Sequence, residues 1–115
     1  MATALSVSPA LSVFRIDRFT VPEKALGRFV AQLRQTQQAL DLLPGCLQNL
    51  VLTQPAVEGA YGVMTVVEWA DEDAFVEARA VMRRTYDEVS FDPMAFMTEL
   101  GVTADMGTYH RLIGM

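Results

Sequence analysis

Residues 62–69 carry apolar side chains at successive positions rather than at alternate ones. Neighbouring side chains of a strand point to opposite sides of a sheet, so this segment is apolar on both faces. Such a strand needs cover on both faces. A chain of 115 residues has little material to cover both sides of its own sheet, so the pattern predicts a second chain against one of them. The positions concerned are Val63, Met64, Val66 and Val67.

The rest of the pattern predicts further strands and amphipathic helices. β-branched and aromatic residues favour strands at residues 11–20, 46–53, 61–69 and 108–113. Apolar residues three and four apart predict a helix over residues 21–42, a second from about Asp71, and a third over residues 94–100. The inner face of the first helix is Leu26, Phe29, Val30, Leu33 and Leu40, interrupted only by Gln37, and that of the second is Phe75, Ala78, Met82, Tyr86 and Val89.

Local signals support these boundaries. Thr20 and Glu23 have the spacing of a capping box, and Pro22 is tolerated in a first helical turn. Asp71 is a good N-cap for the second helix, and Asp92-Pro93 starts the third helix, which Gly101 closes. Pro44-Gly45 ends the first helix.

The order of elements predicts a ferredoxin-like α+β fold. It consists of a four-stranded antiparallel sheet with both main helices on one face. We expect a flexible N-terminal arm at residues 1–10 and a single domain at residues 11–115. Burying the open face of the sheet against a two-fold partner predicts a homodimer.

The first strand places different chemistry on its two faces. Phe14 and Ile16 share one face, whereas Arg15 and Asp17 share the other with Phe19. Charge beside apolar residues fits a lined cavity better than a dry core. The two charges are candidates to bind a polar substituent of a substrate, or to pair with each other at a dimer interface.

The composition of the chain indicates which classes of binding partner are unfavourable. Hydrophobic residues make up 51% of the chain, and a net charge of −5 with no basic run argues against nucleic acid and anionic membranes. Residues 1–10 lack the features of a signal peptide, and no apolar stretch approaches the ~20 residues of a membrane helix. Cys46 is the single cysteine, which excludes an intrachain disulfide and suits a cytoplasmic location.

Three segments of the chain form a recognisable set. They are residues 19–22 leading into the helix with Phe29, the Pro-Gly turn of residues 43–47, and residues 68–75 with a strand-end tryptophan and an acidic turn. Together these segments resemble the antibiotic biosynthesis monooxygenase-like family of dimeric α+β barrels. Some members of that family oxidise polycyclic phenols or quinols without a cofactor, and others degrade haem. The resemblance implies the barrel, the dimer and a monooxygenase, but leaves the substrate open.

Trp69 is the first candidate for chemistry. The resemblance implies that it lines a pocket between the sheet and the helices. Its indole N–H could donate a hydrogen bond to a substrate oxygen, and its ring could stack on a planar substrate. The alternative is a core aromatic residue at the end of its strand.

His110 is the only histidine and the natural candidate for a general base near neutral pH. Nothing near it in sequence orients its ring, so an exposed strand histidine is the alternative. Asn49 is a candidate polar contact. Phe75, Met82 and Tyr86 share a helix face that could line the pocket, and packing is the alternative for them.

The chain departs from the family in places that matter for chemistry. Where haem-degrading members supply a histidine, this chain has Arg79, and its first strand lacks their asparagine. Phe75 stands where quinone-forming members can carry a tyrosine. No phosphate-binding loop, flavin or nucleotide motif, or zinc-ligand cluster is present in the sequence, so we expect no cofactor.

These observations predict a cofactor-independent monooxygenase that oxidises a planar aromatic, phenolic or quinol-type small molecule. The main alternative is a non-catalytic dimeric barrel that binds a hydrophobic small molecule. A haem-degrading monooxygenase is the weaker alternative.

Overall fold

The computed structural model describes residues 11–112, so the predicted arm at residues 1–10 lies outside it. Among the described residues, no helix is both long and apolar enough to cross a bilayer. The elements are β1 (Val13–Pro22), a 3₁₀ turn (Glu23–Ala25), α1 (Leu26–Asp41), β2 (Cys46–Val57), β3 (Ala60–Trp69), α2 (Glu72–Glu88), α3 (Pro93–Leu100) and β4 (Thr103–His110).

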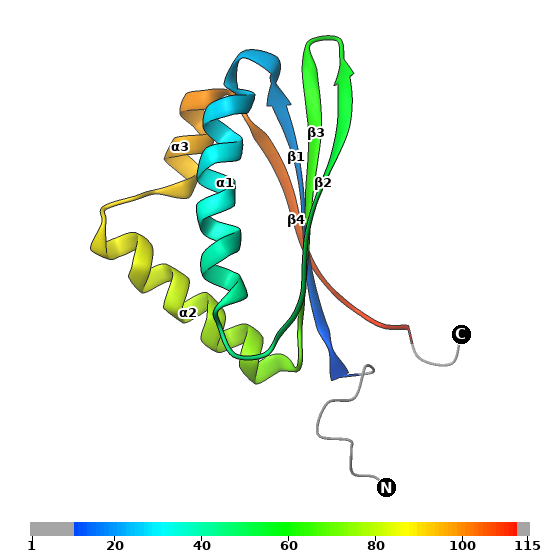
Figure 1. Cartoon of the computed structure of the whole chain (residues 1–115), viewed down its shortest axis with the longest axis vertical. Coiled ribbons are helices and arrows are strands. Elements are labelled where there is room, and N and C mark those ends of the chain that lie inside the picture. Colours follow the sequence, from blue (N-terminus) through cyan, green and yellow to red (C-terminus); the bar gives the residue numbers. More distant parts are fainter. Residues whose placement is uncertain (1–10, 113–115) are drawn as a thin grey trace, which may run out of the picture.

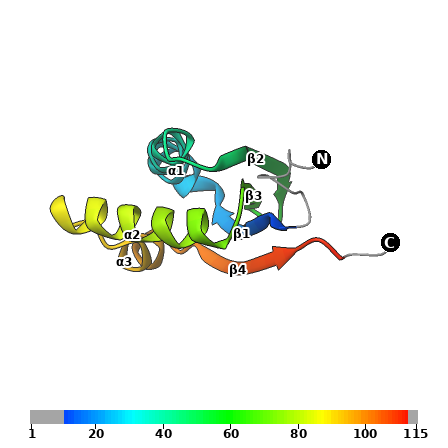
Figure 2. The ribbon, with the colours of Figure 1, turned by 90° about the horizontal axis from the view of Figure 1, so that it is seen from below.

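The four strands form one antiparallel sheet in the order β2-β3-β1-β4. All three helices lie on the same side of this sheet (Figures 1 and 2). The other side, here called the open face, carries no helix from residues 11–112. This arrangement is the predicted ferredoxin-like α+β fold.

Two apolar clusters hold the helices against the sheet, one at each end. The first joins Phe19 and Val63 to α3 and the start of α1. The second joins Val13 and Trp69 to α2. Along β1 and β3, the inward positions between the clusters are held by Arg15, Asp17, Thr65 and Val67, and of these only Val67 belongs to a cluster.

Both later helices begin as their sequence signals predict. The Asp71 carboxylate accepts a hydrogen bond from the Ala74 backbone N–H at 2.9 Å, which makes it the N-cap of α2. Asp92 caps α3 in the same way, ahead of Pro93 in the first turn. Gly101, at φ 75°, ends α3 in the left-handed conformation that glycine tolerates best.

The predicted start of the first helix is wrong. β1 continues through Pro22 because its pairing with β3 extends to Ala60. The capping box of Thr20 and Glu23 does not form, and the turn that follows has no side-chain cap.

Three further boundaries differ from the prediction. β2 extends to Val57, which leaves Glu58-Gly59 as the turn to β3. β4 begins at Thr103 rather than at residue 108, because its pairing with β1 reaches Thr20. Val89, predicted on the inner face of α2, is 69% exposed and lies just after the helix.

Candidate functional site

A cavity of about 200 Å³ lies between the central strands and helices α1 and α2. A second cavity, of about 140 Å³, adjoins it under α3. The two cavities share five lining residues. Their combined volume reaches the lower end of the roughly 300–1,000 Å³ that is typical of ligand pockets. The shared residues are Asp17, Thr36, Gln37, Thr65 and Tyr86.

The register of the two central strands explains why polar groups face this space. Asp17 on β1 pairs with Thr65 on β3, and Arg15 pairs with Val67. Side chains alternate along each strand, so these four share the helix-covered face with Trp69. The predicted assignment of Arg15 and Asp17 to one face of the strand is confirmed.

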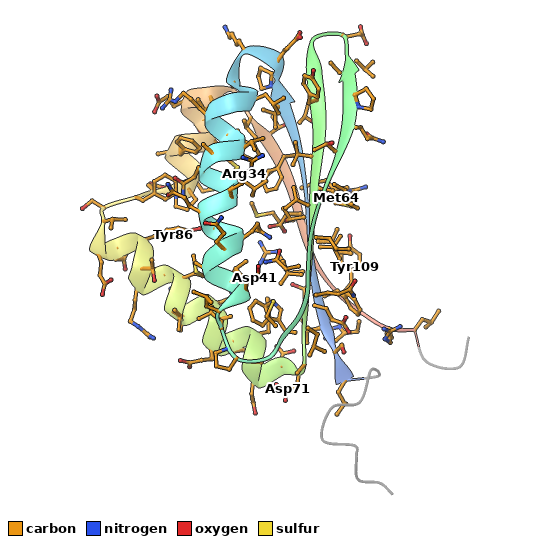
Figure 3. The ribbon with its side chains drawn as sticks, viewed as in Figure 1. Arg34, Asp41, Met64, Asp71, Tyr86 and Tyr109 are labelled. Atoms are coloured by element: carbon orange, nitrogen blue, oxygen red, sulfur yellow. The ribbon has the colours of Figure 1, made fainter. Side chains whose placement is uncertain are left out.

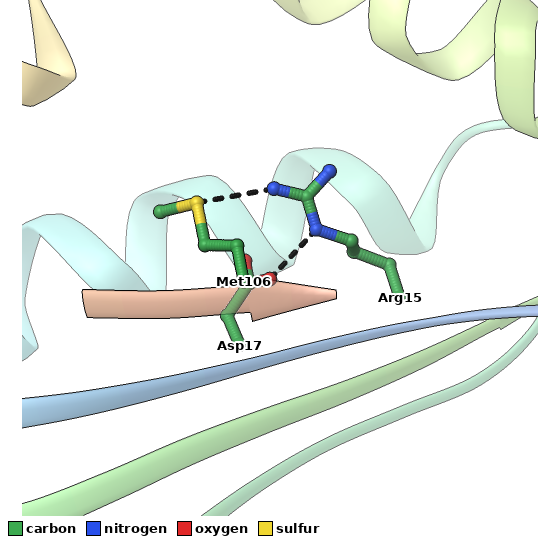
Figure 4. Close-up of polar contacts among 3 residues, drawn as sticks. All are labelled: Arg15, Asp17 and Met106. Carbon is green, nitrogen blue, oxygen red and sulfur yellow. Dashed lines mark hydrogen bonds and ion pairs between the residues drawn. The ribbon is translucent and has the colours of Figure 1, made fainter. Parts of the chain in front are cut away.

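Arg15 and Asp17 form an ion pair inside the cavity (Figure 4). The Arg15 Nε donates to Asp17 Oδ1 at 2.7 Å, and Arg15 Nη2 donates to the Met106 sulfur of β4 at 3.1 Å. The Arg15 and Asp17 side chains retain 30% and 17% of their exposure. Within residues 11–112, Arg15 Nη1 and Asp17 Oδ2 have no hydrogen-bond partner. Each member of the pair therefore keeps an atom that can meet a ligand.

The electrostatics of Asp17 follow from this position. Desolvation by burial raises the pKa of the Asp17 carboxyl above 3.8, while the hydrogen bond from Arg15 and its charge act in the opposite direction. The carboxylate is thus a stronger base than one in water.

Aromatic and apolar groups form the end of the cavity nearest α2. Trp69 is 2% exposed and lines the cavity beside Phe75 and Ala78. Among the described residues, its indole N–H has no hydrogen-bond acceptor. The Arg79 guanidinium lies 5.5 Å from the centroid of the Phe75 ring. This end can take a flat apolar group and still offer it a donor.

Tyr86 closes the space between the two long helices. Its hydroxyl shares a hydrogen bond of 3.0 Å with the Thr36 hydroxyl of α1, and its ring contacts Phe91 at 5.3 Å between centroids. Figure 3 shows Tyr86 near the C-terminal end of α2. Met82, one turn earlier on α2, lines the same cavity.

Two predicted residues lie elsewhere. Asn49 is not among the lining residues, because it joins β2 to α1 through hydrogen bonds to Gln37 and Asp41. His110 lies at the exposed end of β4, with Nε2 3.9 Å from a Glu72 carboxylate oxygen, and is 56% exposed in its side chain. The structure thus brings six of the eight predicted site residues together, namely Trp69, Arg15, Asp17, Phe75, Met82 and Tyr86.

Sequence reasoning missed Thr65 and Gln37, although each left a signal. Thr65 is a polar residue among the apolar side chains of β3, and it is buried. Gln37 interrupts the apolar stripe of α1, and its Nε2 donates to Asn49 at 2.6 Å. Its carboxamide is thereby fixed at the cavity wall. In both cases, a single polar residue on an otherwise apolar face of a strand or helix could have identified the residue from the sequence.

A metal centre has no support in the described part of the chain. Among residues 11–112, no three His, Cys, Asp or Glu side chains gather as metal ligands would. The chemistry available in the cavity is that of an ion pair, an indole N–H, hydroxyl and carboxamide groups and aromatic surface.

Comparison with known proteins supports the fold. No family model and no curated protein sequence matches the chain. Solved structures do match it. A single-residue mutant of SnoaB, a cofactor-independent oxygenase from Streptomyces nogalater, has 22% identity and a TM-score of 0.62, covering 92% of this chain and 100% of SnoaB.

Two further solved structures have the same fold as this chain. A candidate monooxygenase from Shewanella loihica PV-4 has 21% identity and a TM-score of 0.67, covering 90% of this chain and 96% of its own. A candidate antibiotic biosynthesis monooxygenase from Deinococcus radiodurans has 17% identity and a TM-score of 0.66. The match covers 90% of this chain and 95% of that protein's chain. The predicted resemblance to this group of structures is confirmed at the level of the fold.

Proposed function

We propose that the chain is an antibiotic biosynthesis monooxygenase-like enzyme that oxidises a planar phenolic or quinol-type molecule without a cofactor. The observation that carries the proposal is a cavity that combines the Trp69 and Phe75 rings with one ion pair, in the fold of SnoaB. Aromatic walls with few polar groups suit a flat aromatic ligand.

The reaction uses the substrate as its own reductant. For an anthrone, the ionised substrate reacts with molecular oxygen at its methylene carbon. One oxygen atom becomes the new carbonyl oxygen, and the other leaves as water with the two methylene hydrogens. The protein supplies a dry pocket, removal of the first proton, and donors for the negative charge that develops on oxygen. Trp69 is the proposed donor and stacking wall.

Oxygen uptake tests the proposal directly. Purified protein is incubated with a panel of anthrones and quinols, and uptake is compared with the spontaneous rate. The Trp69→Phe variant removes the indole N–H and keeps an aromatic ring, so turnover should fall on the order of a hundredfold while binding is retained. Uptake no faster than the spontaneous reaction across the panel contradicts the proposal.

The second candidate is a non-catalytic module that binds a hydrophobic molecule in the same cavity. It is favoured by the exposed position of His110, which leaves the cavity without a histidine among its lining residues. Phe75 also offers no hydroxyl there. Ligand binding without turnover in both the wild-type protein and the Trp69→Phe variant would support this candidate.

The proposal includes a homodimer formed through the open face. Apolar side chains from all four strands lie on that face, and Met64 and Tyr109 are among them (Figure 3). A contiguous exposed apolar patch of this kind marks an interaction surface. The others in the patch include Phe14, Ile16, Leu50, Leu52 and Val66. Sedimentation showing only a 12.7 kDa species at micromolar concentration would contradict the dimer.

The cellular location is also part of the proposal. Cys46 is free, which fits the reducing cytoplasm predicted from the sequence.

A further inference from the structure

The proposed oxidation begins with loss of a proton, yet the predicted base, His110, lies at the exposed end of β4. The cavity itself holds four titratable side chains, which are Arg15, Asp17, Arg79 and Tyr86. Of these, only Asp17 is a carboxylate and can accept a proton near neutral pH. The base is therefore best sought in the ion pair at the middle of the cavity.

We propose that Asp17 is the general base that removes a phenol proton from the substrate, and that Arg15 binds the phenolate oxygen that results. The inference rests on the proposed function and adds the first chemical step to it. In a quinol, or in the enol form of an anthrone, the substrate O–H bond breaks, its electron pair stays on the substrate oxygen, and the proton forms an O–H bond with the Asp17 carboxylate.

Charge balance favours this division of roles. Before the transfer, the Arg15 guanidinium is paired with the Asp17 carboxylate at 2.7 Å. After the transfer, Asp17 is neutral, and the substrate phenolate becomes the anion beside Arg15. The half-buried cluster keeps the same net charge throughout, so ionising the substrate does not leave an uncompensated charge inside the protein.

The free atoms of the pair fit the two roles. Asp17 Oδ2 and Arg15 Nη1 have no hydrogen-bond partner within residues 11–112, and Arg15 Nη2 is turned to the weak acceptor Met106 Sδ. Because the two residues are two apart on one strand, their side chains point the same way. A phenol group between them can give its proton to one and accept hydrogen bonds from the other.

The groups that face Asp17 support a base rather than a permanently ionised carboxylate. From β1 it faces Arg15, from β3 Thr65 and from β4 Met106, while α1 contributes the neutral Thr36 and Gln37. From α2, Tyr86 and Arg79 line the same space, and α3 contributes Met97 to the adjoining cavity. Burial raises the pKa of the Asp17 carboxyl, which brings its basicity closer to that of a phenolate.

Counting protons on binding tests the inference without turnover. The probe is 2-hydroxyanthraquinone, used one pH unit below its own pKa, because its phenolate absorbs at longer wavelength than the phenol. Calorimetry in two buffers of different protonation enthalpy then gives the protons released per bound probe. The wild-type protein should bind the red-shifted phenolate with almost no proton release, since Asp17 captures the proton.

The variants separate the two roles. In Asp17→Asn, Arg15 still binds the phenolate, so about one proton should go to the buffer for each phenolate bound. In Arg15→Met, the bound probe should lack the red shift. Asp17→Glu keeps a carboxylate and should restore proton capture. Glu99→Gln and Arg28→Met, which break the exposed ion pair between α3 and α1, are the matched controls and should behave as wild type.

Each remaining result overturns one identifiable claim. No red shift with the wild-type protein, or the same proton count in Asp17→Asn as in wild type, overturns the inference. Proton capture by Asp17 without any oxygen uptake on the anthrone panel leaves the inference standing and overturns the proposed oxygenase. Near-UV circular dichroism checks that each variant has the wild-type tertiary structure.

Discussion

Asp17 shows how a half-buried carboxyl contributes to the pH response of the protein. Because burial raises its pKa above 3.8, the folded protein holds the Asp17 proton more tightly than the unfolded chain does. Raising the pH through the folded-state pKa therefore costs stability as the half-buried carboxyl ionises. This cost is consistent with the proposed role of Asp17 as a base.

The Asp17→Asn variant isolates that effect. Its side chain does not ionise, so the variant avoids the loss of stability that the wild-type protein suffers as pH rises. The free energy of unfolding of the variant minus that of wild type should increase between pH 3 and pH 7. Urea unfolding at several pH values measures it. A difference that stays constant or falls with pH would show that Asp17 is not a desolvated carboxyl.

At the residue scale, prediction from the sequence succeeded where one strand or helix decides the outcome. Arg15 and Asp17 follow from alternation along β1, and Phe75, Met82 and Tyr86 follow from helical spacing along α2. His110 and Asn49 did not reach the cavity because their positions depend on the pairing of β4 and on a clamp between β2 and α1. Such long-range contacts have no local signature.

At the element scale, the turn between α1 and β2 is limited by a close approach. Gly45 has φ 87°, and a Cβ added there would lie 2.6 Å from the Cβ of Ala74 on α2. The Gly45 carbonyl also accepts a hydrogen bond from the Ala70 N–H at 2.8 Å. Glycine at position 45 thus allows the turn to pack against the start of α2. This contact lies next to Trp69, the last residue of β3.

Gly45→Ala should destabilise the protein more than Gly59→Ala. Both positions have positive φ, so each substitution carries a backbone cost of roughly 1–2 kcal/mol. Gly59 has nothing within 4 Å of an added Cβ, whereas Gly45 adds overpacking of about 1–3 kcal/mol. Urea midpoints of the two variants measure the difference. Equal losses would mean that the contact with Ala74 relaxes without cost.

Element order was predictable because each helix and strand carries its own periodic pattern. The ends of β1 and β4 were not, because a strand continues as far as its neighbour pairs with it. The sequence predicts that Val21 and Pro22 start a helix. In the structure they belong to β1 and pair with Tyr61 and Ala60 of β3. The caps of α2 and α3 were predicted correctly because capping is a local hydrogen bond.

At the scale of the whole molecule, the sheet separates two roles. Its helix-covered face carries the cavity, and its open face carries the proposed dimer surface. The apolar residues on both sides of β3 first indicated this division. A change confined to one face should therefore leave the property of the other face intact.

Ile16→Glu tests that separation. A carboxylate in the centre of the open face should turn the dimer into a 12.7 kDa monomer by sedimentation, because burying the charge in the interface is unfavourable. Binding of 2-hydroxyanthraquinone should persist. Val76→Glu, at a 54% exposed position on α2, is the control and should remain dimeric. Retention of the dimer by Ile16→Glu would place the interface elsewhere.

The order β2-β3-β1-β4 also has an evolutionary consequence. Arg15, Asp17, Thr65 and Trp69 all lie on the two inner strands, and the edge strand β2 contributes none of the residues that line the 200 Å³ cavity beside Trp69. Mutations can accumulate along β2, lengthening it or changing its exposed side chains, without moving the inner strands relative to each other. A lineage of such proteins can therefore change its assembly while it inherits the same cavity geometry.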